Sequence, residues 1–238
     1  MAVRIGVHPV LEALRAGRPL ERVVIARGIA GPRMQEIIEL ARAHGVPVRF
    51  EPRDALDRLA GSSTHQGVVA LGAAQRHADL QDLIAGARMI VLLDGVEDPH
   101  NLGAIVRTAH AAGADAIVTP ERRAAGLTET VAKAAAGALE HLPVARVANI
   151  GQAIEKLKAA GFWIYGLDER GAEDYDRVEF TAPTALVLGS EGRGLHEMVR
   201  KRCDFLVRIP LAGKISSLNV SVAAGIVLFE WKRRLAIR

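Results

Sequence analysis

The stretch IPLAGKISSLNVSVAAGIVLFE, residues 209–230, is the part of this 238-residue chain on which its interpretation depends. It begins as the end of an apolar strand, passes through a short polar loop and continues as an apolar helix. Ser216, Ser217 and Asn219 lie in the loop or the first helical turn, where side-chain oxygens cap backbone N–H groups or hold a ligand. By itself the stretch predicts a strand–helix junction, and a helix cap explains its polar residues as well as a ligand site does.

Two further stretches have the same form. DGVEDPHNLGAIVRTA at 94–109 and LVLGSEGRGL at 186–195 each join an apolar strand to a helix through a loop rich in glycine and small polar residues. In open α/β sheets, ligands bind at the carboxyl ends of the strands. The three loops are therefore predicted to converge on one binding site.

Apolar strand-like segments alternate with helix-like segments after residue 80. The strand-like segments are 89–93, 115–119, 143–147, 162–166, 184–189 and 205–210. The helix-like segments between them are 101–112, 128–138, 150–160 and 194–202. This alternation predicts an α/β fold, with a mostly parallel sheet that has helices on both faces. The fingerprint G-x-G-x-x-G of an ordinary dinucleotide-binding fold is missing after the first strand.

Residues 1–72 show a separate pattern of shorter helix-like and strand-like segments, which predicts a small α/β domain. This part carries ten arginines and seven acidic residues and has no glycine-rich phosphate loop. Residues 73–79 are polar and lack periodicity, so they are predicted to be a linker. Residues 80–238 would then form the second, larger domain.

The composition is that of a globular protein with a modest positive charge. Half of the residues are hydrophobic, and the formal net charge of +4 permits a nucleic-acid partner without requiring one. No apolar run reaches the roughly 18–20 residues of a membrane span, and the N-terminus lacks the features of a signal peptide. Cys203 is the single cysteine and the histidines are scattered, so no metal site is expected. We expect a cytoplasmic protein without a membrane contact.

In their order and spacing, the three stretches resemble the signature motifs of the SpoU/TrmH family of RNA ribose 2'-O-methyltransferases, within the SPOUT superfamily. The resemblance spans residues 79–238, and it implies a trefoil knot whose loops bind S-adenosylmethionine. GVHPVLEAL at 6–14 and HQGVVAL at 65–71 resemble the N-terminal substrate-binding domain of the branch that modifies ribosomal RNA. That domain is similar to a small RNA-binding ribosomal-protein fold.

The resemblance also implies two sets of site residues. Backbone atoms of Gly189, Ile209 and Leu218 would hold the cofactor, since a glycine lets a ligand approach the backbone and apolar side chains can flank an adenine ring. The alternative is that Gly189 is a turn residue and the other two belong to the core. The implied catalytic residues are Asn101, Arg107, Glu191, Ser217 and Asn219.

Each catalytic candidate also has a structural interpretation. Asn101 lies near a predicted helix start and could be an N-cap. Arg107 lies in the otherwise apolar segment AIVRTA, so its cation either extends to water or points at an anion, and we favour a phosphate beside the target ribose. Glu191 is expected to orient Asn101 or Arg107, or else to be a solvated turn residue. Ser217 and Asn219 would hydrogen-bond the substrate or the cofactor, or cap a helix.

The two-domain length and the opening at 6–14 make the chain most similar to the branch that methylates a guanosine of 23S ribosomal RNA. We therefore predict an enzyme that uses S-adenosylmethionine to methylate a ribose 2'-hydroxyl in 23S ribosomal RNA. The resemblance further implies a homodimer, with the small-residue segment 131–143 and the C-terminal helix as candidate interfaces. A transfer RNA 2'-O-methyltransferase, a resistance enzyme that methylates a ribosomal RNA adenosine, and a non-catalytic RNA-binding factor of ribosome assembly stay open as alternatives.

Overall fold

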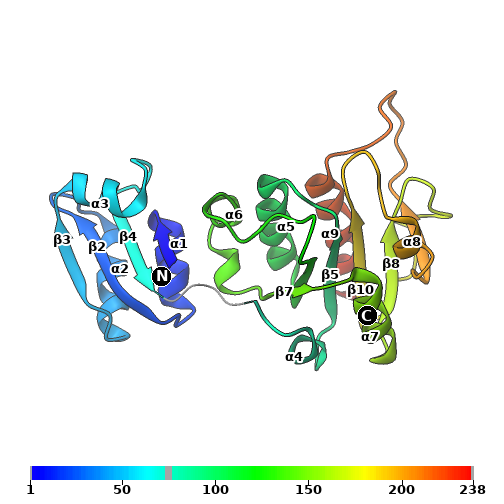
Figure 1. Cartoon of the computed structure of the whole chain (residues 1–238), viewed down its shortest axis with the longest axis horizontal. Coiled ribbons are helices and arrows are strands. Elements are labelled where there is room, and N and C mark those ends of the chain that lie inside the picture. Colours follow the sequence, from blue (N-terminus) through cyan, green and yellow to red (C-terminus); the bar gives the residue numbers. More distant parts are fainter. Residues whose placement is uncertain (1, 73–76, 237–238) are drawn as a thin grey trace. The chain divides into compact units, whose positions relative to one another are not determined.

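The computed structural model describes residues 2–72 and 77–236, which form two compact units (Figure 1). Unit 1 combines the described residues before 73 with the segment Ala135–His141, and unit 2 contains the remaining described residues. The predicted linker at 73–79 falls in part on residues 73–76, outside the described residues, and the predicted domain limits on either side of it stay predictions. No helix within the described ranges is long and apolar enough to cross a membrane.

Unit 1 is built on a four-stranded sheet in the order β1-β4-β2-β3. Its elements are β1 (Ala2–Ile5), α1 (Val7–Arg15), β2 (Leu20–Ala26), α2 (Pro32–Ala43), β3 (Val48–Glu51), α3 (Arg53–Ala60) and β4 (Val68–Gly72). Alternate side chains of a strand point to opposite faces, so β2 contributes to two cores. Val23 and Ile25 pack with α1 and α2, whereas Val24 packs with α3 on the other face. The predicted small α/β domain therefore has helices on both sides of its sheet.

The two stretches that carry the N-terminal resemblance contact each other. Gly6 directly precedes α1 and has a φ of 97°, a conformation that favours glycine. At the start of α1, the backbone N–H of Val7 donates to the side-chain oxygen Oε1 of Gln66 at 3.1 Å. His65 is fully buried, and its Nδ1 accepts from the backbone N–H of Gly67 at 2.9 Å. These contacts fix the junction between the start of the 65–71 stretch and the first helix.

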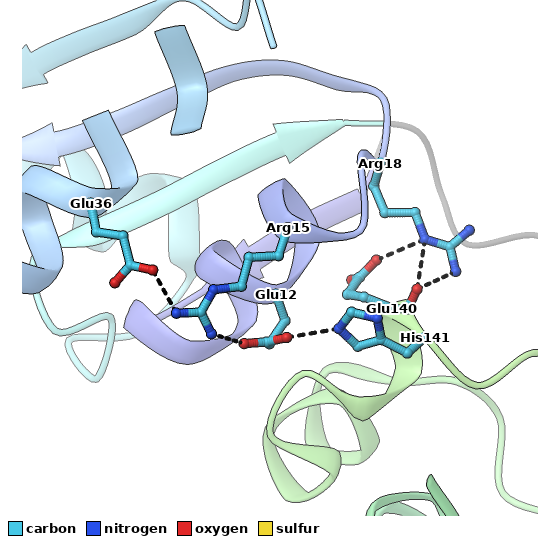
Figure 2. A network of polar contacts seen from close by, with 6 residues as sticks. All are labelled: Glu12, Arg15, Arg18, Glu36, Glu140 and His141. Atoms are coloured by element: carbon cyan, nitrogen blue, oxygen red, sulfur yellow. Dashed lines mark hydrogen bonds and ion pairs between the residues drawn. The ribbon is translucent and has the colours of Figure 1, made fainter. Parts of the chain in front are cut away.

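The segment Ala135–His141 is held in unit 1 by polar contacts with α1 (Figure 2). His141 Nε2 lies 2.7 Å from the carboxylate of Glu12, and Arg15 donates to the same carboxylate at 2.6 Å. Burial of Glu12 opposes its ionisation, but the hydrogen bonds from His141 and Arg15 outweigh burial and hold the pKa of Glu12 below its ordinary value. Gly137 is needed at this contact, because a Cβ there would lie 2.6 Å from Glu12 Cγ.

The predicted helix over 128–138 is shorter in the structure. α6 (Glu129–Ala135) ends before Ala136 and Gly137, which adopt positive φ values of 48° and 91°. An α-helix cannot continue through such residues. A short 3-10 helix, η1 (Ala138–Glu140), follows instead.

Unit 2 is built on a seven-stranded sheet in the order β7-β6-β5-β10-β8-β11-β9, and all of its described strand pairs are parallel. Its strands are β5 (Met89–Asp94), β6 (Ala116–Pro120), β7 (Val144–Val147), β8 (Trp163–Leu167), β9 (Glu173–Asp174), β10 (Thr184–Gly189) and β11 (Phe205–Arg208). The predicted parallel sheet is confirmed. Every residue of β5 and β10 is buried, as expected of strands that are covered on both faces. The trefoil knot implied by the resemblance stays a prediction.

Helices cover both faces of this sheet (Figure 1). α5 (Pro99–Ala112) and α9 (Val220–Ala236) pack on each other, while α4 (Leu80–Ile84), α7 (Ile150–Ala159) and α8 (Glu197–Arg200) belong to a separate core. Ile90 of β5 and Val187 of β10 belong to the same core as Leu157 of α7, so they face this second group. Trp231 of α9 donates from Nε1 to Thr184 Oγ1 at 3.0 Å, which fixes α9 beside the start of β10.

Candidate active site

The three motif loops lie at the carboxyl end of the unit 2 sheet. We define them as motif loop 1 (94–101), motif loop 2 (189–195) and motif loop 3 (209–219). β5 and β10 are parallel neighbours with Asp94 opposite Gly189, so motif loops 1 and 2 begin side by side. β11, which leads into motif loop 3, pairs with β8, the other neighbour of β10. The sheet order thus confirms that the three loops converge.

Motif loop 2 folds back on itself in a tight turn. Ser190 and Gly194 exchange two backbone hydrogen bonds of 3.1 and 3.0 Å, and Gly192 and Gly194 have positive φ values of 78° and 66°. A Cβ on Gly189 would lie 2.2 Å from the carbonyl carbon of Gly194. The fold of this loop therefore requires glycine at position 189, whether or not a ligand is bound.

Asp94 ties motif loop 1 to the chain just after motif loop 2. Its buried side chain accepts a hydrogen bond from the backbone N–H of His196 at 2.8 Å, and its other oxygen lies 2.9 Å from His196 Nδ1. Sequence reasoning missed both residues. The available signal was an acidic residue at the end of an otherwise apolar strand, because a buried carboxylate requires hydrogen-bond donors.

Three of the predicted catalytic residues form a closed ring of hydrogen bonds, with one residue from each motif loop. Asn101 Nδ2 donates to Glu191 Oε1 at 3.0 Å. Asn219 Nδ2 donates to the same Glu191 oxygen at 2.8 Å and to Asn101 Oδ1 at 2.9 Å. We call Asn101, Glu191 and Asn219 the polar ring. It joins positions that are up to 118 residues apart in the sequence.

The structure tests the helix-cap interpretations of the two asparagines. α5 is capped by Asp98, whose carboxylate accepts from the backbone N–H of His100 at 3.0 Å, so the N-cap interpretation of Asn101 is wrong. Asn219 does cap a helix and is also a member of the polar ring. Its Oδ1 accepts from the backbone N–H of Ser221 at 2.9 Å, at the start of α9, while its Nδ2 belongs to the polar ring.

Arg107 and Ser217 are not part of the polar ring. Arg107 lies six positions after Asn101 on α5, a rotation of about 240° around the helix axis, and its side chain is exposed. Among the residues that the structure describes, its guanidinium has no hydrogen-bond or ion-pair partner. Glu191 contacts Asn101 and not Arg107. Ser217 is exposed in motif loop 3.

A cavity lies between motif loops 2 and 3 and the residues that follow β8. Gly189, Ile209 and Leu218, the three predicted cofactor residues, all line it, and so does Ser217. Its remaining apolar wall is formed by Leu167, Leu188, Leu211, Val220 and Ala223. A mostly apolar hollow with a few convergent polar groups is typical of a site for a small molecule.

A second, polar cavity adjoins the first one and shares Ser190 and Arg193 with it. Its other lining residues are Gly95, Glu97, Asp98, Arg123, Glu191 and His196. The polar ring therefore reaches the wall of this second cavity through Glu191. The two cavities together can hold an apolar ring system in one and a polar group in the other.

Two family models match the chain. The SpoU rRNA Methylase family matches residues 88–229, a range that includes all three motif loops. The chain belongs to the SpoU/TrmH family of RNA methyltransferases. A second model, RNA 2'-O ribose methyltransferase substrate binding, matches residues 5–78.

Members of the SpoU/TrmH family match along nearly the whole chain. The putative TrmH family tRNA/rRNA methyltransferase YacO of Bacillus subtilis is 45% identical over 236 residues, which cover 97% of this chain and 94% of YacO. The SpoU methyltransferase AviRb from Streptomyces viridochromogenes, solved with the cofactor AdoMet, has a TM-score of 0.84 at 29% identity and covers 99% of this chain and 91% of its own. An AdoMet-bound rRNA methyltransferase from Sinorhizobium meliloti has a TM-score of 0.82 at 30% identity, over 98% and 87% of the two chains.

The double role of Asn219 predicts unequal effects of two substitutions. Asn219→Ala removes both the α9 cap and the ring donor, whereas Asn219→Ser removes the ring donor and keeps a capping oxygen. The cap contributes about 1 kcal/mol, and leaving Oδ1 of the buried Asn101 without its donor costs about 1–3 kcal/mol. Urea unfolding followed by tryptophan fluorescence should therefore rank stability as wild type, then Ser, then Ala. If Asn219→Ser is as unstable as Asn219→Ala, the cap does not contribute to stability. If Asn219→Ser is as stable as the wild type, the polar ring does not contribute.

Proposed function

We propose that this protein transfers a methyl group from S-adenosylmethionine to a ribose 2'-hydroxyl of 23S ribosomal RNA, at a guanosine. The observation that carries the proposal is the convergence of three motif loops on an apolar cavity beside a closed polar ring. Two solved relatives bound to AdoMet support the cofactor. The rRNA methyltransferase from Sinorhizobium meliloti and the substrate-binding match at 5–78 support ribosomal RNA and ribose as the target.

The cavity fits S-adenosylmethionine in its chemistry. Ile209 and Leu218 offer apolar surface for an adenine ring, and Gly189 contributes to the cavity wall. When bound, this cofactor supplies a methyl group that is activated by its sulfonium. Backbone atoms of these three residues would hold it, and Ser217 offers a hydroxyl to the cofactor or the RNA.

Arg107 acts on the RNA in this proposal. A guanidinium stays protonated in proteins, so its contribution is to bind a phosphate beside the target ribose and to stabilise negative charge on the 2'-oxygen as its proton leaves. Its exposure and its lack of a partner in the described ranges leave it available for this role. The polar ring keeps the three motif loops in register, so that the hydroxyl and the methyl group meet in line.

The test is transfer of labelled methyl groups from S-adenosylmethionine to purified unmodified ribosomal RNA and transfer RNA, offered separately. Label in 23S RNA that maps to a guanosine 2'-oxygen is expected. Label in transfer RNA alone would keep the chemistry and overturn the substrate, and label at an adenosine would indicate a different target. No transfer to either RNA, together with intact cofactor binding, would favour a binding protein over an enzyme.

Variants of Arg107 test its role in the same methyl-transfer assay. Arg107→Ala should reduce methyl transfer by about 100-fold or more, the range seen when one charge-stabilising donor is removed from an active site. Cofactor affinity should stay within about twofold, because Arg107 does not line the cofactor cavity. Arg107→Lys keeps the charge but not the paired N–H geometry and should retain part of the rate. Transfer at the wild-type rate in the Ala variant would remove Arg107 from the mechanism.

In this proposal, unit 1 binds the RNA backbone through an arginine-lined hollow beside α3. Arg22, Arg49 and Arg58 line it. Arg22 and Arg58 each have one acidic partner, Glu21 at 2.9 Å and Asp54 at 3.1 Å. Arg49 has no such partner among the described residues. Guanidinium groups suit phosphate because they donate two parallel N–H groups.

Replacing two of these arginines should weaken RNA binding in a way that depends on salt. The double variant Arg49→Ala with Arg58→Ala should bind 23S RNA about tenfold more weakly and lower the salt slope of the affinity by about two, or one per lost phosphate contact. A matched control replaces Arg33 and Arg42, which are exposed on α2 at the opposite face of the sheet. Equal losses in both double variants would show that net charge and not this hollow binds the RNA. Filter binding across a salt series measures both.

The proposal includes a homodimer that buries an apolar stripe on α9. Val222 and Phe229 are 52% and 48% exposed, large values for apolar side chains, and Ile226 lies between them. Their spacing of four and three residues places them on one face of the helix. A second copy of the chain is the occupant we assign to this face.

Phe229→Glu should convert the dimer into a monomer, since it replaces the largest apolar side chain of the stripe with a charge. Sedimentation velocity measures the change. Phe50→Glu is the matched control, because Phe50 is equally exposed, at 50%, but lies on the edge strand β3 of unit 1. A wild-type protein that sediments as a monomer, or a Phe229→Glu variant that stays dimeric, would contradict the assignment.

A further inference from the structure

Asp168 is a buried acidic residue at the end of β8 that the motifs do not include. Its backbone N–H donates to the carbonyl of Val207 on β11 at 3.0 Å. Its Oδ1 accepts from the backbone N–H of Arg170 at 2.9 Å, with Arg170 Nε a further 3.3 Å contact. One carboxylate oxygen is therefore occupied by the turn that follows the strand.

The second carboxylate oxygen of Asp168, Oδ2, has no hydrogen-bond partner in the described part of the chain, although it is buried. The Asp168 side chain as a whole is 1% exposed. A buried polar atom without a partner costs about 1–3 kcal/mol, and more where the group is charged. The other such atom is Arg4 Nη1, but there the rest of the guanidinium is bound to Glu140 at 2.7 and 3.3 Å. At Asp168 one of only two acceptors is left unused.

The location of Asp168 indicates where a hydrogen-bond donor for Oδ2 can come from. Asp168 lines the cavity that also contains Gly189, Ile209 and Leu218. The wall also contains donors, among them Ser217 and Arg193, but none of them hydrogen-bonds Oδ2 within the described residues. Arg170 contacts Oδ1 and is 60% exposed, so it does not satisfy Oδ2. A ligand in the cavity can supply the missing donor.

We propose that Asp168 is a cofactor-binding residue whose Oδ2 accepts a hydrogen bond from a donor group of S-adenosylmethionine, either a ribose hydroxyl or the amino-acid ammonium. This inference rests on the proposed function, because it takes the occupant of the cavity from there. Burial in an apolar wall strengthens such a bond, since it lowers the local dielectric constant. Asp168 thereby adds a charged side chain to a site that otherwise holds the cofactor through backbone atoms and apolar contacts.

Titration calorimetry on the full chain with S-adenosylhomocysteine, which does not react, tests the assignment. Asp168→Asn keeps the Oδ1 acceptor that the turn uses and places an amide donor where Oδ2 was. We expect its affinity to fall about 10- to 100-fold, the range for losing a hydrogen bond to a charged group, with an unchanged melting temperature. Glu169→Gln is the matched control, because Glu169 lines the same cavity but is exposed. Its affinity should equal that of the wild type.

Ligand variation on the wild-type protein provides a test that does not depend on the folding of a variant. Methylthioadenosine lacks the amino-acid part with its ammonium and carboxylate, and a 2'-deoxy and a 3'-deoxy analogue each lack one ribose hydroxyl. The donor is identified by a large loss that disappears in Asp168→Asn, because a loss that persists in this variant arises from other contacts. Wild-type affinity in Asp168→Asn, or equal affinity for all these ligands, would overturn the role of Asp168 and leave the proposed function standing. A wild-type protein that binds neither S-adenosylmethionine nor S-adenosylhomocysteine would overturn the proposed function itself.

Discussion

The parallel pairing of β5 with β10 is the constraint on which the site in unit 2 depends. The two strands are buried along their whole length, so the apolar packing of both faces sets their register. That register places Asp94 opposite Gly189, so motif loops 1 and 2 begin side by side at the same edge of the sheet. A slip of one residue would exchange the faces of every side chain in the strand and would separate Asn101 from Glu191. The core therefore places the starts of the loops, and contacts between the loops then fix their side chains.

The polar groups of the motif loops fall into two classes. In the first class, each group finds a partner within the protein, as in the polar ring and in the contact between Asp94 and His196. In each network a buried residue, Asn101 or Asp94, is paired with exposed ones, so the buried polar atoms keep their hydrogen bonds only in this one arrangement. The second class comprises Arg107, Ser217 and one oxygen of Asp168, which have no hydrogen-bond partner among the described residues. Groups of the first class hold the loops, and those of the second class are left for ligands.

The sequence predicted the larger features because they depend on periodicity. Continuous apolar segments indicated buried parallel strands, and loops after such strands had to meet at one edge. The family resemblance, and not the pattern, connected Asn101, Glu191 and Asn219, and the structure gives the connection its physical form as a ring. Asp94 and Asp168 escaped prediction because a single acidic residue after a strand carries no periodic signal.

Local backbone geometry accounts for the helix predictions that failed. Alanine is the best helix former, and the run at 131–138 is rich in it, yet Ala136 and Gly137 leave the helical region. The close contact of Gly137 with Glu12 of α1 decides this local structure. The predicted helix at 194–202 shrinks to α8 because His196 is held by Asp94 before the first turn begins. In both places a tertiary contact overrides the local preference.

Gly189 shows why stability and ligand binding are difficult to separate at a motif position. A side chain there would collide with the backbone of Gly194 and push motif loop 2 away from the sheet. Glu191 belongs to that loop, so the displacement would also open the polar ring and release motif loops 1 and 3. A glycine at this position is therefore required before any cofactor enters the cavity. Arg107 and Asp168 Oδ2 contribute little to the packing of the loops, which makes them the positions where binding and catalysis can be measured apart from folding.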